Sequence, residues 1–277
     1  MNSKLTDRFS TVMLTTALFI VALMYLFPIL WLLLSSLKPG SELFSYPLSI
    51  IPENPTFDGF VYSWSTMEFI KYFWNTLVVA IITTVLTVIA SATCGYALAK
   101  YHYKWLNVFL ICMLATTMLP TEVIMTPTFS VILDLGLYDS LSGLIIPSIN
   151  TATGIFMFRQ YFMTVPNDLI ESARIDGANE GRIFFGLMLP IAKPVVITLA
   201  IFSFQWRWND YIWPLIVLSD PNKYTVQIAL RSLIGADNID WVLLLSSSII
   251  SLVPMILIFI VFQRYIMDTG ATSGLKG

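Results

Sequence analysis

A cation and an anion lie three residues apart within an apolar stretch: Arg207 and Asp210, in the run FQWRWNDYIWP at residues 204–214. At this spacing we expect them on one face of a helix, near the middle of a membrane span. A charge at that depth costs about 2.5–3.5 kcal/mol on insertion scales, so such a pair faces protein or water. Either the pair neutralises itself and fixes helix packing, or it belongs to the wall of a solute passage. In a passage, Trp206 or Trp208 offers a flat face for a sugar ring, and Asn209 or Asp210 offers hydrogen bonds.

A further acid, Glu122, lies in the run LPTEVIMTP at residues 119–127, between two prolines. Broken helices near the bilayer midplane hold substrate and cation sites in secondary transporters. No neighbouring residue completes a carboxylate relay, so a packing role at the helix break is the favoured interpretation. An ion-coupled carrier that uses Glu122 or Asp210 is the alternative function.

The sequence lacks the motifs of the common catalytic and metal sites. His102, the single histidine, stands between Lys100 and Lys104 at a predicted membrane edge, and Cys94 and Cys112 lie in apolar runs without zinc-ligand spacing. HExxH, GxSxG and the phosphate-binding GxxxxGK[ST] are all absent. We therefore expect a chain that is not an enzyme, with no metal site and no cofactor of its own. An intramembrane protease or glycosyltransferase is disfavoured for the same reason.

The stretch PNDLIESARIDGANEGRIFFGLMLP, residues 166–190, has the pattern of two short helices joined by a turn, and we call it the elbow. Pro166 and the polar residues after it favour a helix start. Gly177 is placed to end that helix in the left-handed conformation. Asn179 is placed to cap a second helix, which Pro190 is expected to end.

The charges of the elbow alternate in sign along the chain, at Glu171, Arg174, Asp176, Glu180 and Arg182. A helix that lies on anionic lipid carries instead a face rich in Lys and Arg. The elbow therefore fits a protein partner better than a lipid surface.

Composition places these features in a membrane protein. The chain of 277 residues is 57% hydrophobic and only 12% charged, with a mean hydropathy of +0.77. Its net charge of −2 gives no basic surface for nucleic acid. A membrane-crossing helix needs about 20 apolar residues, and continuous runs of that length favour a helical bundle over a barrel. We expect six transmembrane helices, at about residues 11–37, 69–99, 105–133, 141–158, 191–218 and 241–262.

Orientation follows from the distribution of Lys and Arg, which gather on the side that holds both termini and the elbow. The positive-inside rule places that side in the cytoplasm. The elbow then joins spans four and five in the cytoplasm, and a short cytoplasmic tail follows at about residues 263–277. No composition shift divides residues 1–277, so we expect a single all-α membrane domain.

The elbow also carries a family motif. Glu171, Ser172 and Ala173, then Gly177, then LMLP at residues 187–190 resemble the EAA loop of binding-protein-dependent ABC importer permeases. That loop reads Glu-Ala-Ala, three residues, Gly, nine residues, Ile, any residue, Leu-Pro. Here Ser172 replaces an alanine and Leu187 replaces the isoleucine. Two further runs, RIDGA at 174–178 and FQRYI with GLKG near the C-terminus, are similar to the carbohydrate branch, of the maltose and glycerol-phosphate type.

The resemblance implies that a cytoplasmic ATPase receives the elbow in a surface cleft. Glu171 would then make a charge-assisted contact with the ATPase, Gly177 would permit the turn, and Leu187 and Pro190 would anchor the elbow to the bundle. The residues expected to take part in this coupling are Glu171, Ser172, Ala173, Arg174, Asp176, Gly177, Leu187 and Pro190.

The resemblance also implies the rest of an importer in a bacterial inner membrane. Its parts are a second, homologous permease, two ATPase subunits that hold ATP and Mg²⁺, and an extracytoplasmic solute-binding protein. By position, Gly235, Asp237 and Asn238 would contact the solute-binding protein, and Arg264 and Lys276 in the tail would contact the ATPase. The implied activity is ATP-driven sugar import by alternating access.

Overall fold

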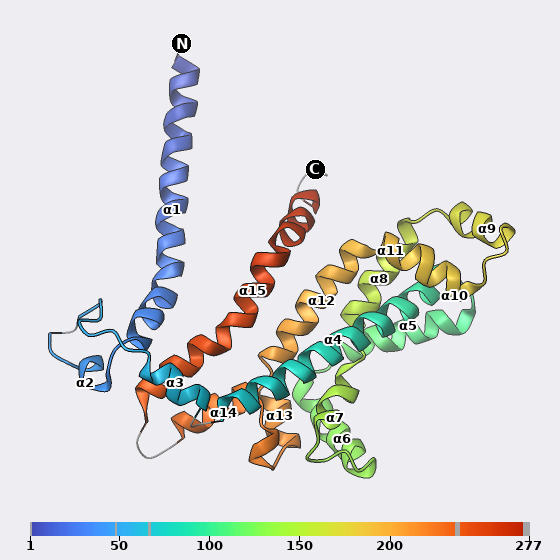
Figure 1. The fold of residues 1–277 in the computed structure, drawn as a ribbon. Coiled ribbons are helices and arrows are strands. Elements are labelled where there is room, and N and C mark those ends of the chain that lie inside the picture. The colour runs from blue at the N-terminus through green and yellow to red at the C-terminus, as the bar shows by residue number, and fades with distance from the viewer. Residues whose placement is uncertain (1, 48, 66–67, 236–238, 274–277) are drawn as a thin grey trace. The chain divides into compact units, whose positions relative to one another are not determined.

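The structure is a computed structural model of the chain, and it describes residues 2–47, 49–65, 68–235 and 239–273. Side chains at positions 2–10, 264 and 266–273 lie outside this description. Within the described residues every regular element is a helix (Figure 1). The predicted all-α class is therefore confirmed.

Three helices are long and apolar enough to cross a bilayer unaided: α1 (Asn2–Ser36), α4 (Phe69–Lys100) and α15 (Trp241–Ser273). Three further candidates are bent pairs of shorter helices. The pair α5 (Lys104–Thr116) and α6 (Thr121–Asp134) is bent by 112°, and α10–α11 meets α12 (Lys193–Trp208) at 78°. The segment Leu141–Ser148 meets α8 (Ala152–Thr164) at 40°. The predicted number of six spans is reached only when each bent pair counts as one span.

The contacts of the chain group into two compact units. The first unit comprises Met1–Phe69 and Leu230–Val253, and the second comprises Ile70–Ala229 and Pro254–Gly277. The shorter elements are α2 (Gly40–Leu43), α3 (Asp58–Ser65), α7 (Leu141–Ile145), η1 (Ile146–Ser148), α9 (Asn167–Ile175), α10 (Glu180–Ile183), η2 (Phe184–Met188), α11 (Leu189–Ile191), α13 (Ile212–Val217), η3 (Pro221–Lys223) and α14 (Val226–Ile234).

The first unit packs its helices through small polar side chains. Ser247 Oγ donates to Ser63 Oγ at 3.0 Å, and Ser246 Oγ donates to the carbonyl of Ser36 at 3.4 Å. A Cβ at Gly59 would overlap Ser246, so this glycine permits the close approach of α3 and α15. The proline-rich loop after α1 is ordered by Glu42, whose carboxylate accepts from the N–H of Glu53 at 2.9 Å.

The second unit has an apolar cluster toward each end. One lies beside the elbow and includes Phe158, Phe162 and Met188. The other joins α6, α7 and α13 and includes Ile132, Leu144 and Trp213. Figure 1 shows α9 and α10 at one end of this unit and α6, α7 and α13 at the other, with α4 running between the two ends.

Two of the predicted spans differ from the structure in the same way. The sequence indicates a third span broken at Pro120 and Pro127. Pro120 does precede α6, but Pro127 lies inside α6 without ending it, and the 112° bend means that α6 does not continue the direction of α5. The fifth predicted span, residues 191–218, divides after Trp208, and α13 begins only at Ile212. Both differences leave non-helical backbone within an apolar region, which is tolerated where it is buried in protein or lines a cavity.

Candidate functional site

The elbow begins and turns as its sequence predicts. Pro166 precedes α9, and Gly177 adopts a φ of +80° just after that helix. The N–H of Ala178 donates to the carbonyl of Ala173 at 3.0 Å, and the N–H of Gly177 donates to Arg174 at 3.0 Å. This pair of bonds is the Schellman motif, which satisfies the last carbonyls of a helix and needs a left-handed residue. Asn179 caps α10, because its Oδ1 accepts from the N–H of Arg182 at 2.9 Å.

The predicted end of the second helix at Pro190 is one residue early: the helix ends at Ile191, and the chain then bends by 78° into α12. The chain winds on through η2, a π-helical turn, in which the N–H of Leu189 donates to the carbonyl of Phe184. Pro190 then lies in α11, and the N–H of Ala192 donates to Met188 at 3.0 Å. Because proline has no N–H, the widened turn accommodates it inside the helix, and the bend follows at Ala192. Leu187 is partly buried and Pro190 exposed, so the fully buried side chain of this segment is Met188.

The elbow has a buried face and an exposed face. Ile170, Ile183 and Met188 are buried in the cluster beside α4 and α8. On the other face Glu171, Ser172 and Asp176 are exposed, and the side chain of Ile175 is 86% exposed. The outer face of α9 is therefore polar, with Ile175 as its exposed apolar side chain.

Within the elbow, Arg174 is already paired. Its guanidinium lies 2.8 Å from the carboxylate of Glu180, and the same carboxylate accepts from the hydroxyls of Tyr101 at 2.7 Å and Tyr96 at 3.3 Å. The Tyr101 hydrogen bond, reinforced by Arg174, lowers the pKa of Glu180. Tyr96 and Tyr101 are not among the residues predicted from the sequence. Their only sequence signal is a pair of aromatic hydroxyls beside Lys100 at the edge of an apolar run.

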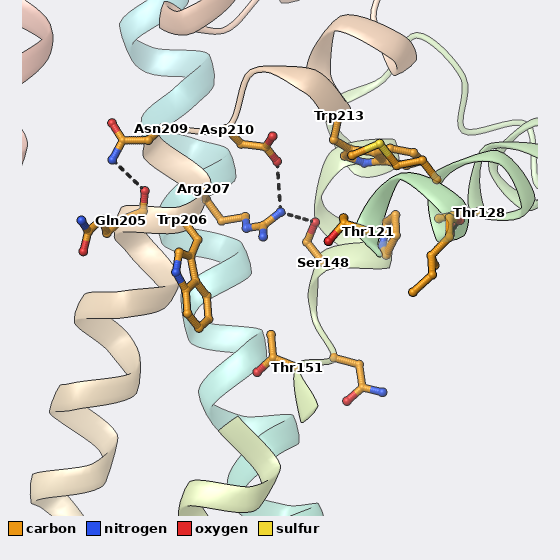
Figure 2. Close-up of a pocket in the computed structure, with 14 residues that line it drawn as sticks. Thr121, Thr128, Ser148, Thr151, Gln205, Trp206, Arg207, Asn209, Asp210 and Trp213 are labelled. Carbon is orange, nitrogen blue, oxygen red and sulfur yellow. Dashed lines mark hydrogen bonds and ion pairs between the residues drawn. The ribbon is translucent and has the colours of Figure 1, made fainter. Parts of the chain in front are cut away.

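A pocket of about 570 Å³ opens at the other end of the second unit (Figure 2). Three helix breaks supply its lining: the start of α6 at Thr121, the segment between α7 and α8, and the break between α12 and α13. Eleven lining residues are polar or aromatic: Asn150, and the ten labelled in Figure 2, which are Thr121, Thr128, Ser148, Thr151, Gln205, Trp206, Arg207, Asn209, Asp210 and Trp213.

Arg207 and Asp210 meet in this pocket, but not on one helix face. Because α12 ends at Trp208, Asp210 lies beyond the helix, and its Oδ2 is 3.2 Å from Arg207 Nη1 across the helix end. Arg207 Nη1 also donates to Ser148 Oγ at 2.8 Å. Both side chains are 22% exposed and both line the pocket, so the pair neutralises itself at the pocket wall.

The two tryptophans before Asp210 have different surroundings. Trp206 is 39% exposed and lines the pocket. Trp208 is 1% exposed, and its ring packs against Phe73 at 5.3 Å and Phe204 at 5.6 Å between centroids. The sequence leaves open which tryptophan faces the passage, and the geometry favours Trp206. Asn209 lines the pocket while its side-chain amide donates to the carbonyl of Gln205 at 3.0 Å.

The remaining predicted residues lie elsewhere. Glu122 is exposed in the first turn of α6 and is not a lining residue of the pocket. Gly235 is exposed just after α14. Asp237, Asn238 and Lys276 lie outside the described residues, as does the side chain of Arg264. Among the residues that the structure describes, no group of His, Cys, Asp and Glu is arranged to hold a metal ion.

Comparison with known proteins shows the family. Residues 91–268 match the model of the binding-protein-dependent transport system inner membrane component, and the chain belongs to this family. The chain is 39% identical to the arabinooligosaccharides transport system permease protein AraQ of Bacillus subtilis over 267 residues, or 95% of each chain. It is 33% identical to the sn-glycerol-3-phosphate transport system permease protein UgpE of Pectobacterium atrosepticum over 94% of each chain.

A solved structure agrees with the fold. A chain of a bacterial ABC transporter that imports the acidic polysaccharide alginate superposes with a TM-score of 0.85 and 26% identity, covering 94% of this chain and 97% of that one. The resemblance that the elbow motif indicates is therefore confirmed: the protein is an ABC transporter permease subunit.

Proposed function

We propose that this chain is one transmembrane half of an ATP-driven sugar importer, and that it works by alternating access. The observation that carries the proposal is the pocket formed where three spans break. Non-helical backbone at membrane depth occurs where it lines a water-filled cavity, and this pocket offers the aromatic face of Trp206 beside hydroxyls and amides. Flat aromatic faces with nearby hydrogen-bonding groups suit a sugar ring.

The elbow is the proposed contact with the ATPase. Its inner face is buried against the bundle and its outer face presents Glu171, Ser172 and Ile175. Nucleotide-driven closure of an ATPase dimer would change the contacts of this outer face. Such a difference in contacts between two states is what shifts a conformational equilibrium. ATP and Mg²⁺ belong to the ATPase in this account.

The assembly that we propose contains four further subunits. A second, homologous but different permease completes the passage, two ATPase subunits bind at the elbows, and a solute-binding protein delivers the solute from outside. The elbow and both chain termini face the cytoplasm of a bacterium, in whose inner membrane the complex resides. The family description and the names of the relatives support this assignment.

The pocket favours an uncharged carbohydrate. Among the described residues that line it, the charged ones are Arg207 and Asp210, which pair with one another. A phosphate or carboxylate would need a cation that is free to bind it. Of the relatives, the arabinooligosaccharide permease is named for a neutral sugar and is also more similar than the glycerol phosphate permease.

An ion-coupled carrier is the less favoured alternative. It needs an acid that is exposed in the passage and free to bind and release a cation. Asp210 is held by Arg207, and Glu122 is not in the pocket. The family assignment also disfavours it.

The proposed function is tested with the tagged chain, co-expressed with the second permease and the ATPase from neighbouring genes. We expect the ATPase to co-purify, and Glu171→Lys to abolish this while Glu53→Lys, a charge reversal on an exposed loop, leaves it intact. Uptake of arabinose oligosaccharides into proteoliposomes should require ATP and survive collapse of ion gradients. An intact ATPase complex with Glu171→Lys, or uptake that follows an ion gradient, would refute the proposal.

A further inference from the structure

The end of α4 contacts the chain at the entrance to the elbow. Lys100, its last residue, donates from Nζ to the carbonyl of Val165 at 2.6 Å and to Oδ1 of Asn167 at 2.8 Å. Val165 follows the last residue of α8, and Asn167 is the first residue of α9. One ammonium therefore joins α4 to the point where the elbow begins.

The same end of α4 also contacts the far side of the elbow. Tyr101 continues the last turn, with its N–H donating to Ala97 at 3.1 Å, and its hydroxyl donates to Glu180 at 2.7 Å. Glu180 is the first residue of α10 and also binds Arg174 of α9. Hydrogen bonds to an ionised carboxylate are roughly twice as strong as neutral ones. The elbow is thus fastened to α4 on both sides of its exposed helix.

The opposite end of α4 is fastened to another segment. Asn75 Nδ2 donates to the carbonyls of Asn222 at 2.9 Å and Tyr224 at 3.1 Å. The next residue, Thr76, accepts at Oγ1 from the N–H of Val226 at 2.8 Å. The segment that holds these three partners follows the pocket-lining residues in sequence and leads into α14.

Between these two ends α4 is uninterrupted. It has 32 residues and no internal proline, and at about 1.5 Å per residue it is ~48 Å long. The other three spans that lie wholly in the second unit are bent pairs, with bends of 40° to 112°. Prolines and π-turns are common causes of sharp bends in helices, and neither occurs in α4. It is the described element of this unit best suited to move as one body.

From this geometry we propose that α4 carries the movement of the elbow to the rest of the second unit, and that Lys100, Tyr101 and Glu180 are the positioning residues that fasten the elbow to it. The inference rests on the proposed function, in which an ATPase binds the elbow. The side chain of Glu180 is half-exposed beside the proposed ATPase contact, whereas Tyr101 lies at the end of α4, so the hydroxyl of Tyr101 acts after the ATPase has bound. When these contacts are removed, the ATPase should still hydrolyse ATP but the pocket should no longer open and close with it.

The test measures access to the pocket in the assembled importer. Thr128→Cys, a lining residue, is introduced with Cys94→Ala and Cys112→Ala, and the complex is reconstituted in proteoliposomes with the ATPases outward. A membrane-impermeant maleimide, added outside, labels the cysteine through the elbow side. Trapping with MgATP and vanadate should close that side and slow labelling when the elbow is unaltered.

Tyr101→Phe removes one hydroxyl, and Glu180→Gln removes one charge while keeping the shape. We expect both variants to retain the bound ATPase and to hydrolyse ATP. The ratio of labelling rates without and with vanadate should fall by roughly fivefold or more in both variants. Fivefold is the lower end of the usual coupling between two sites. Vanadate protection as complete as with the unaltered elbow, in Tyr101→Phe, would overturn the proposal. Should Glu180→Gln lose its ATPase, Tyr101→Phe alone decides.

Tyr103→Phe is the matched control. Tyr103 is exposed and its ring stacks on Tyr101 at 6.4 Å, but its hydroxyl has no hydrogen bond within the described part of the chain. We expect full vanadate protection for this variant. A merely structural role of Tyr101 would lower thermal stability without altering protection. If the proposed function itself is wrong, vanadate will not protect the cysteine even in the protein with the unaltered elbow. That result differs from loss of protection in Tyr101→Phe alone.

Discussion

Arg207 and Asp210 form an ion pair across the end of α12, with Nη1 and Oδ2 3.2 Å apart. The two side chains neutralise each other and also line the pocket. The sequence leaves open whether they form a self-neutralising pair or part of a passage wall, and the structure has both properties. The pocket wall can thus be polar without carrying net charge. Ser148, which accepts from Arg207 at 2.8 Å, ties this pair to the break before α8.

The first prediction concerns the energy of this pair. Arg207→Gln and Asp210→Asn each leave one charge without its partner, which typically costs about 1–3 kcal/mol for a poorly solvated group. The double variant removes both charges, so its loss of unfolding free energy should be smaller than the sum of the two single losses. Thermal unfolding in detergent measures the cycle, and we expect a coupling energy of about 0.5–3 kcal/mol. Simple additivity would show that the two side chains do not interact.

Gly177 offers a test of the elbow's shape. Its φ of +80° is strained for residues with a Cβ, by about 1–2 kcal/mol. We expect Gly177→Ala to loosen the Schellman turn and to weaken ATPase binding. Gly181→Ala is the control, because its Cβ would meet only Asn179 Oδ1 at 3.6 Å and its φ is ordinary. Co-purification of the ATPase is measured for both; equal yields would contradict the importance of the turn.

The two tryptophans of α12 should respond in opposite ways. Trp208→Ala removes a fully buried ring, and such truncations cost about 3–5 kcal/mol. Trp206→Ala removes a ring from the pocket surface, so stability should change little while sugar uptake falls. Melting temperature and proteoliposome uptake are measured for each variant. Unchanged uptake in Trp206→Ala would remove this side chain from the passage.

A pH dependence follows from Asp139, in the turn before α7. The N–H of Asp220 at 3.0 Å, Lys223 Nζ at 2.7 Å and the N–H of Ser219 at 2.9 Å hold its pKa well below the ordinary range. An unfolded aspartate titrates near about 3.9. The folded state therefore binds fewer protons, so the stabilisation is complete above the unfolded pKa and is lost as pH falls toward the folded pKa.

The corresponding variant is Asp139→Asn, which keeps the shape and tolerates the positive φ of +53°. We expect its melting temperature to lie below that of the natural protein by a constant amount above about pH 5, since the aspartate is then ionised in both states. The difference should shrink below about pH 4. A difference that is independent of pH down to pH 3 would mean that the charge of Asp139 contributes nothing.

The sequence predicts what depends on neighbouring residues. Gly177, Asn179 and the start of α9 follow from local backbone chemistry, and the structure confirms them. Pro190 itself stays within the helix, because a π-turn with the buried Met188 accommodates it, and the helix ends one residue later at Ile191. The end of α12 at Trp208, inside the predicted span 191–218, also depends on packing. No glycine or proline marks Trp208 as the last helical residue, and tertiary contacts decide it.

Other features depend on segments far apart in the chain. The pocket requires three helix breaks to converge, and no single stretch indicates that convergence. The choice between Trp206 and Trp208 depends on the rotation of α12, which a uniformly apolar span leaves undetermined. The contact of Tyr101 with Glu180 joins residues 79 positions apart. The local charge pattern predicts that Glu180 belongs to the elbow, but it does not predict the contact with Tyr101.

The most direct test of the account is a photo-crosslinker at Ile175, the most exposed large apolar residue of the elbow. It is installed in the full chain in its native membrane, and adducts are identified by mass spectrometry. We predict an adduct with a polypeptide that carries the phosphate-binding GxxxxGK[ST] motif, reduced when Glu171→Lys is present. Adducts with lipid alone, or the same ATPase adduct regardless of Glu171, would contradict the claim that the outer face of the elbow is the ATPase contact.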